Sequence, residues 1–135
     1  MHLFTYGSLM FEPVWSRLVR GSYMKRTARL HGFARRRVRG DIYPVVFKSH
    51  DADWVDGMVY LNVSDEDVRR LDVFEGDLYD RQSQWVVVEG AEKVIASAYV
   101  LKETYAHMTD DRDWDPQWFA RSGLRTFLGG YKGFR

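Results

Sequence analysis

The N-terminal segment reads HLFTYGSLMFEPVWSRLV over residues 2–19, and this stretch decides how the fold is interpreted. Residues 2–6 have the pattern of a short strand, which Gly7 and Ser8 interrupt. Pro13 then opens an amphipathic helix, since proline is well accommodated in a first helical turn. The segment predicts a strand, a glycine turn and a helix in direct succession.

The middle of the chain is predicted to be mostly sheet. β-branched and aromatic residues are concentrated in residues 23–37, 45–47 and 54–63. Between these runs lie residue types that favour turns: Gly32, Gly40 and residues 51–53. We therefore expect several short strands.

A helix is predicted after this sheet. Ser64 is a good N-cap, and the three acids that follow it suit the positive end of the helix dipole. We expect the helix to end at Glu75, directly before Gly76.

The last part of the chain predicts a hairpin and a final helix. Residues 79–89 and 94–101, connected by residues 90–92, have regular apolar positions. Asp115 as N-cap and Pro116 at the first helical position then begin a helix that Gly129 and Gly130 close.

The order of these elements favours an α+β fold. With 135 residues and 15.9 kDa, the chain has the size of one domain, so we expect a single domain over residues 1–135. A sheet-rich centre and few helices favour a small mixed sheet, curved or closed into a β-barrel, with a few flanking α-helices.

The composition excludes several kinds of site. The chain has no cysteine, which removes disulfides, thiolate nucleophiles and Cys-based metal centres. Its four histidines show no metal-ligand spacing, so we expect no metal and no cofactor. No apolar run approaches the roughly 20 residues that cross a bilayer, and no charged leader is present. We expect a cytoplasmic protein that does not bind membranes.

The net charge of +1 conceals an asymmetry. Residues 1–50 carry ten Lys and Arg against two acids, and residues 51–135 carry ten against seventeen, about +8 and −7. In one domain these segments interleave, so we interpret the charges as mutually compensating and expect no nucleic-acid partner. Nucleic-acid binding through the arginines of residues 25–39 is the alternative.

Glu75 is the first candidate for chemistry. On the helical period, positions 68, 71 and 75 share a face, so a carboxylate follows Val68 and Leu71 on the buried stripe. Burial, the negative end of the helix dipole and nearby aspartates all favour the protonated form. Such a group can exchange protons near neutral pH. The alternative is a structural ion pair with Arg81 or another arginine.

The turn Tyr6-Gly7-Ser8-Leu9 is the second candidate. A glycine-containing break between a strand and a helix can direct several unpaired backbone N–H groups toward one point, where they bind a carboxylate or an oxyanion. The alternative is an ordinary glycine turn in which Ser8 satisfies local backbone groups.

Together these features resemble the gamma-glutamylcyclotransferase-like family. The resemblance rests on motifs in family order from residue 1 to about 101: Tyr6-Gly7-Ser8-Leu9, Tyr43-Pro44, Leu71-Asp72-x-Phe74-Glu75-Gly76 with Tyr79-x-Arg81, and Ala98-Tyr99-Val100. The residues after about 105 do not contribute to it.

The resemblance implies a small mixed barrel and a reaction that needs no metal, cofactor or protein nucleophile. Family enzymes convert a gamma-glutamyl amide to 5-oxoproline and a free amine, through attack of the substrate's own alpha-amino group on its gamma-carbonyl. Glu75 would be the catalytic acid and base, and the turn formed by Tyr6, Gly7, Ser8 and Leu9 would hold substrate oxygens. The resemblance also implies substrate contacts at three further positions: Tyr43, Arg81 and Tyr99.

Two alternative interpretations stand beside that of a gamma-glutamyl-amine cyclotransferase. One is a non-catalytic small-molecule binding protein of the same fold, since Glu75 and the turn suit an amine or carboxylate ligand equally well. The other is the nucleic-acid-binding protein. The sequence does not identify the leaving amine or the oligomeric state.

Overall fold

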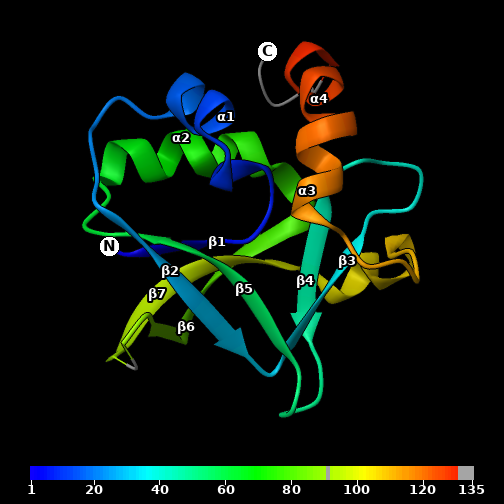
Figure 1. The fold of residues 1–135 in the computed structure, drawn as a ribbon, viewed down its shortest axis with the longest axis horizontal. Helices are drawn as coiled ribbons and strands as arrows, with labels where there is room; N and C mark the ends of the chain where they lie inside the picture. Colours follow the sequence, from blue (N-terminus) through cyan, green and yellow to red (C-terminus); the bar gives the residue numbers. More distant parts are fainter. Residues whose placement is uncertain (91, 131–135) are drawn as a thin grey trace.

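The fold is organised around a closed five-stranded barrel (Figure 1). The computed structural model describes residues 1–90 and 92–130. Around the barrel the strands follow the order β1 (Leu3–Thr5), β5 (Trp54–Tyr60), β2 (Lys25–His31), β6 (Tyr79–Val88) and β7 (Glu92–Leu101). All pairs are antiparallel except β1 and β7, which meet in parallel at Leu3 and Ser97 and close the barrel. The predicted small mixed barrel is confirmed.

A second sheet lies outside the barrel. It contains β3 (Phe33–Arg37) and β4 (Pro44–Lys48), which pair antiparallel from Phe33 opposite Lys48 to Arg37 opposite Pro44. Gly32 and Gly40, at the predicted turns, both have positive φ. This sheet brings Tyr43 and Pro44 against the turn that follows β1, as the pocket described below shows.

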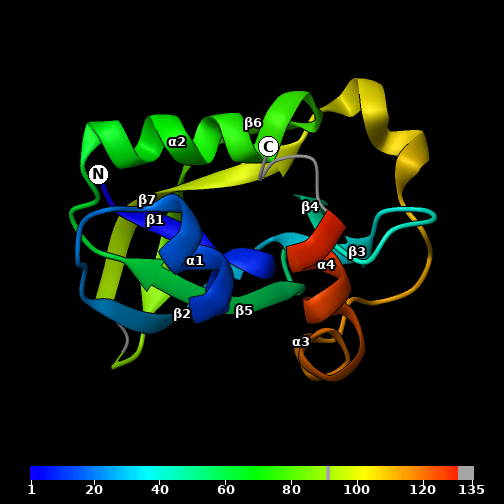
Figure 2. The ribbon, with the colours of Figure 1, turned by 90° about the horizontal axis from the view of Figure 1, so that it is seen from above.

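Two helices cover one side of the barrel (Figures 1 and 2). A 3-10 turn, η1 (Ser8–Met10), follows β1 and leads into α1 (Glu12–Leu18), where Pro13 lies in the first turn as predicted. The helix α2 (Asp65–Glu75) begins at the predicted N-cap, since the Ser64 side chain accepts a hydrogen bond from the Asp67 N–H at 3.2 Å. It ends at Gly76, which has φ +76° and begins the short 3-10 turn η2 (Gly76–Leu78).

The C-terminal helical segment packs beside the second sheet (Figure 2). After the 3-10 segment η3 (Glu103–Met108), it runs through α3 (Pro116–Trp118), the π-helical turn η4 (Phe119–Gly123) and α4 (Leu124–Gly130). Asp115 caps it as predicted, accepting from the Gln117 N–H at 2.9 Å. The helix α4 includes Gly129 and Gly130 and is described up to Gly130, so its closure at these glycines stays a prediction. Glycine costs only about 1 kcal/mol in a helix, and burial of Phe127 anchors the segment.

The core has two parts on opposite sides of the barrel wall. Because side chains alternate along a strand, Phe4 of β1 faces the barrel interior and Leu3 faces the helices, and both are fully buried. The outer cluster includes Trp15 of α1, whose ring stacks on Tyr60 with centroids 3.7 Å apart.

No helix within residues 1–90 and 92–130 is both long enough and apolar enough to cross a membrane.

A buried carboxylate fixes α2 to the connection after α1. Asp67, 1% exposed, accepts hydrogen bonds from the N–H groups of Arg20 and Gly21, from the Tyr23 hydroxyl and from Arg70. Burial by itself raises the pKa of Asp67, but these four donors outweigh it and lower the pKa to about 2. From the sequence, Asp67 was expected only to complement the helix dipole. In the structure it also connects α2 to residues 20–23 through hydrogen bonds.

We expect Asp67→Asn to lower the free energy of unfolding by about 1–3 kcal/mol, because an amide leaves buried donors unpaired. Since the folded pKa lies below the unfolded one, the stabilisation is present above about pH 4 and is lost as the pH falls toward 2. Urea unfolding at pH 7 and pH 3 measures both effects. Asp65→Asn, an exposed acid of the same turn, is the matched control; an equal loss in both variants contradicts the assignment.

Candidate active site

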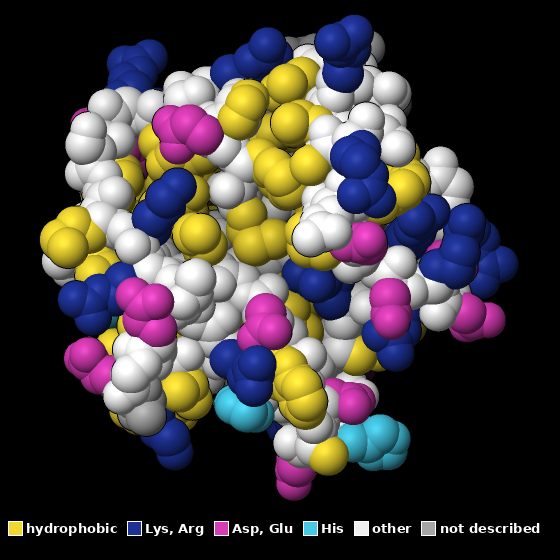
Figure 3. Space-filling model, viewed as in Figure 1, with side chains coloured by type: hydrophobic (Ala, Val, Ile, Leu, Met, Phe, Trp, Pro, Cys, Tyr) yellow, Lys and Arg dark blue, Asp and Glu magenta, His cyan; other side chains and the backbone are white. Residues whose placement is uncertain are grey.

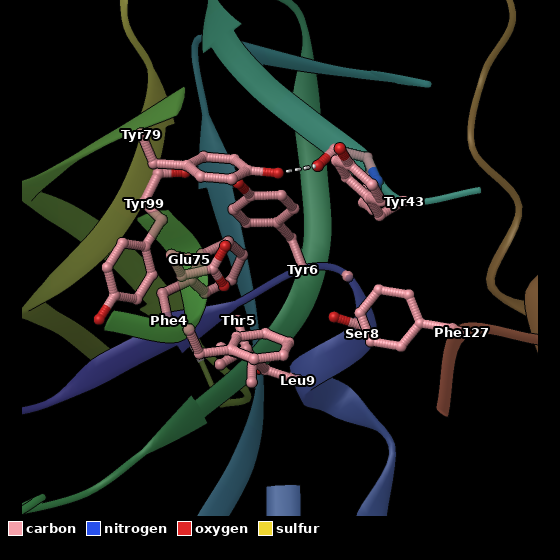
Figure 4. Close-up of a pocket in the computed structure, with 13 residues that line it drawn as sticks. Phe4, Thr5, Tyr6, Ser8, Leu9, Tyr43, Glu75, Tyr79, Tyr99 and Phe127 are labelled. Atoms are coloured by element: carbon pink, nitrogen blue, oxygen red, sulfur yellow. Dashed lines mark hydrogen bonds between the residues drawn. The ribbon is translucent and has the colours of Figure 1, made fainter. Parts of the chain in front are cut away.

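The candidate site is a pocket at the end of β1, facing the C-terminal end of α2 (Figure 4). It encloses about 380 Å³ of empty space, including space open to solvent, at the small end of the range of ligand pockets. Several elements far apart in the sequence line it: Phe4, Thr5, Tyr6, Gly7, Ser8, Leu9, Tyr43, Pro44, Phe74, Glu75, Tyr79, Tyr99 and Phe127.

The turn after β1 forms one wall of the pocket. The 3-10 turn is closed by a hydrogen bond from the Met10 N–H to the Gly7 carbonyl at 3.0 Å, and the N–H groups of Gly7, Ser8 and Leu9 precede that bond. The Ser8 hydroxyl points toward the space that Glu75 also faces (Figure 4). A Cβ at Gly7 would lie 2.7 Å from Cγ of Pro44, so glycine is required for the close approach of the turn to β4.

Glu75 forms the opposite wall. Val68, Leu71 and Phe74 are buried on the same helix, and Glu75, half-buried, follows them into the pocket. Burial, with a smaller contribution from the charge of Asp72, raises the pKa of Glu75 to about 8. Among the described residues no Lys, Arg or His lies within ion-pairing distance of Glu75. The alternative in which Glu75 pairs with Arg81 is therefore wrong.

Arg81 pairs with a different acid. Its Nε and Nη2 atoms donate to Oδ1 and Oδ2 of Asp72 at 2.9 and 3.3 Å. Asp72 Oδ1 also accepts from the Tyr99 hydroxyl at 2.7 Å. Arg81 is not among the residues that line the pocket, because its guanidinium is directed to Asp72; its predicted contact with substrate stays a prediction.

The predicted tyrosines lie at the pocket, but their hydroxyls have other partners. Burial, followed by the hydrogen bond to Asp72, raises the pKa of Tyr99, whose ring lines the pocket. The Tyr6 hydroxyl donates to the Tyr99 carbonyl at 2.5 Å inside the barrel. Burial and a hydrogen bond with Asp41 raise the pKa of Tyr43 to about 12.

Sequence reasoning missed several lining residues. Tyr79 belongs to a motif that the resemblance used, yet no role was assigned to it; its hydroxyl donates to the Pro44 carbonyl at 2.9 Å (Figure 4). Phe127 comes from α4, a part of the chain to which the resemblance did not extend. The other missed residues adjoin predicted ones: Phe4, Thr5, Pro44 and Phe74. Pro44 and Phe74 belong to the quoted motifs, and Phe4 and Thr5 directly precede the first of them, so their position in or beside a motif was the available signal.

The arginine-rich strand β3 is engaged within the protein. Arg36 pairs with Asp113 at 2.7 Å, and the Arg37 guanidinium lies 3.8 Å from the centroid of the Trp118 ring. On the face drawn in Figure 3, Lys and Arg side chains lie mainly at the top and the right of the view, with acidic side chains beside them on the right. Within residues 1–90 and 92–130, no group of three or more His, Asp or Glu side chains is placed to hold a metal ion.

Comparison with known proteins assigns the family. The family model described as "Gamma-glutamyl cyclotransferase, AIG2-like" matches residues 3–116. The chain belongs to this family. Protein AIG2 C of Arabidopsis thaliana is 32% identical over 118 residues, which cover 84% of this chain and 68% of that protein. AIG2-like protein D of the same plant is 30% identical, over 99% of this chain and 89% of that protein.

Solved structures agree with the cyclotransferase-like barrel. A solution structure of an Arabidopsis thaliana protein has a TM-score of 0.70 at 29% identity and covers 95% of this chain and 77% of its own. A protein named gamma-glutamyl cyclotransferase has a TM-score of 0.65 at 18% identity, covering 97% and 87%. At that identity the second likeness shows the fold alone.

The raised pKa of Glu75 predicts a stability that falls as the pH rises. The folded protein binds a proton that the unfolded chain releases between about pH 4.5 and 8, so the free energy of unfolding decreases by at most about 1.4 kcal/mol per pH unit in this window. Glu75→Gln removes this component. We expect the stability of Glu75→Gln relative to the native protein to increase from pH 5 to pH 8 in denaturant unfolding. A difference that is constant with pH contradicts the raised pKa.

Proposed function

We propose that this protein is a gamma-glutamyl-amine cyclotransferase, which converts a gamma-glutamyl amide to 5-oxoproline and a free amine. The observation that carries the proposal is that Glu75 and the turn of residues 6–9, separated by most of the chain, line one pocket. Membership of the gamma-glutamyl cyclotransferase, AIG2-like family supports the same reaction class.

The reaction needs one proton-exchanging group. The substrate's alpha-amino nitrogen forms a bond to its own gamma-carbonyl carbon, and the bond from that carbon to the leaving nitrogen breaks. The ionised form of Glu75 accepts the proton that the alpha-ammonium group must lose, and the neutral acid so formed delivers a proton to the departing amine. Its pKa of about 8 is close to that of an ordinary alpha-amino group, about 8, so the proton moves between nearly matched groups.

The turn supplies the electrostatic part of the reaction. As the ring closes, negative charge develops on the gamma-carbonyl oxygen, where backbone N–H groups of Gly7, Ser8 and Leu9 stabilise it. These donors are fixed by the chain and need no reorganisation during the reaction. Because nucleophile and electrophile belong to one molecule, holding the folded substrate conformer in a small pocket contributes further through orientation.

The surrounding aromatic side chains shape the pocket. Phe74 and Phe127 line the pocket together with Glu75 and make it more apolar, which favours the raised pKa of the acid. Tyr43 and Tyr99 contact the substrate through their rings in this proposal. The single domain over residues 1–135 and the cytoplasmic location stay predictions.

Glu75→Gln should abolish catalysis and leave the fold intact, because the change is nearly isosteric and removes only proton exchange. We expect 5-oxoproline release from a panel of gamma-glutamyl amides to fall by about 100- to 10,000-fold. Glu66→Gln, an exposed acid of the same helix, is the control and should retain full activity. Undiminished turnover by Glu75→Gln disproves the role of Glu75. Thermal stabilisation of the native protein by these amides without any product indicates the non-catalytic binding protein instead.

The turn predicts losses of activity of very different size for substitutions at Ser8 and Gly7. Ser8→Ala keeps every backbone N–H group and should lower kcat by well under the roughly 100-fold seen when an oxyanion donor is lost. Gly7→Ala forces the turn away from Pro44 and should lower kcat by about 100-fold, the effect of a displacement of about 1 Å. Steady-state kinetics of the two variants show whether the backbone N–H groups or the Ser8 hydroxyl bind the substrate oxygen. A larger loss of kcat in Ser8→Ala than in Gly7→Ala assigns this contact to the hydroxyl.

A further inference from the structure

Arg35 makes an unusual contact with the turn. It belongs to β3, outside the pocket lining, and its Nη1 atom donates to the Tyr6 carbonyl oxygen at 2.8 Å and to the Asp56 carbonyl oxygen at 3.2 Å. Its guanidinium carbon lies 5.2 Å from the centroid of the Trp114 ring. A strand that takes no part in the barrel therefore contacts the segment that follows β1.

The charge of Arg35 is not neutralised by a direct ion pair. Within residues 1–90 and 92–130, no carboxylate lies within ion-pairing distance of its guanidinium. The nearby Asp56 side chain pairs with Arg29 at 2.8 Å, and that of Asp113 pairs with Arg36. Burial lowers the pKa of Arg35, but a guanidinium stays protonated in proteins. Its positive charge therefore acts on the two backbone carbonyl groups that accept its hydrogen bonds, those of Tyr6 and Asp56.

The peptide group that receives this charge also carries a proposed donor. The Tyr6 carbonyl and the Gly7 N–H belong to one peptide unit, and they point in opposite directions because the peptide is trans. A cation on the oxygen draws electron density from the nitrogen and makes the N–H a stronger donor, since hydrogen bonds in a chain polarise one another. The Arg35 guanidinium also lies over the Trp114 ring while it donates, a contact that suits arginine better than lysine.

We infer that Arg35 is a positioning residue that polarises the Tyr6–Gly7 peptide and fixes its orientation for the negatively charged oxygen of the reaction; the inference rests on the proposed function. The second sheet then holds the turn from two sides. β3 contributes the Arg35 contact to the carbonyl, and β4 contributes the Pro44 ring that packs on Gly7. This gives the β3–β4 sheet, which is separate from the barrel, a part in the chemistry.

The test uses Arg35→Met and a matched control, Arg29→Met. Arg29 also lies over a tryptophan, 4.7 Å from the centroid of the Trp54 ring, but it pairs with Asp56 instead of donating to the turn. For Arg35→Met we expect an upfield shift of the Gly7 amide proton in NMR spectra and a fall in kcat of about tenfold. This loss is below the roughly 100- to 1,000-fold of a deleted donor. Arg35→Lys should recover part of both effects, and Arg29→Met should change neither.

Two results overturn the inference. One is a Gly7 amide resonance in Arg35→Met that matches the native protein, and the other is a kcat loss of equal size in Arg29→Met. If Arg35→Met does not fold, the same comparison is made with Arg35→Lys, whose ammonium cannot reproduce the planar contact. A native protein that releases no 5-oxoproline disproves the proposed function, and the Gly7 resonance alone then decides whether Arg35 polarises the peptide.

Discussion

Withdrawal of the Glu75 carboxyl group from water is the constraint on which the site depends. The carboxyl lies where α2 ends, next to Phe74 and Phe127 and close to the charge of Asp72, and no described cation pairs with it. A carboxylic acid in such surroundings holds its proton up to about pH 8. Moving Glu75 to solvent, or giving it an arginine partner, would return it to an ordinary surface acid without exchangeable protons at neutral pH.

The fold meets this constraint by keeping the nearby charges occupied elsewhere. Arg81 is held by Asp72, which also accepts from Tyr99, so the cation closest in the motif is directed away from Glu75. On the other side of the pocket the positive charge of Arg35 reaches the turn through a backbone carbonyl. Glu75 therefore faces the turn of residues 6–9 across the pocket, with no described ion-pair partner.

Sequence reasoning predicted the parts of this arrangement that local patterns encode. The helical period placed Glu75 on the buried stripe of α2, and Gly76 marked the end of the helix. The partners of those parts were not predictable, because they depend on contacts between distant segments. Arg81 follows Glu75 closely in the sequence, yet strand β6 directs it to Asp72. Phe127 reaches the pocket from a helix whose docking has no local signal, and Asp67 is buried only because residues 20–23 surround it.

The most direct test is a crystal structure of the protein with 5-oxoproline. The account predicts the lactam carbonyl oxygen accepting from backbone N–H groups of the Gly7–Leu9 turn, with the Glu75 carboxyl within about 3 Å of the ring nitrogen. A lactam bound elsewhere on the molecule contradicts the account. So does one bound in this pocket with Glu75 turned out toward water.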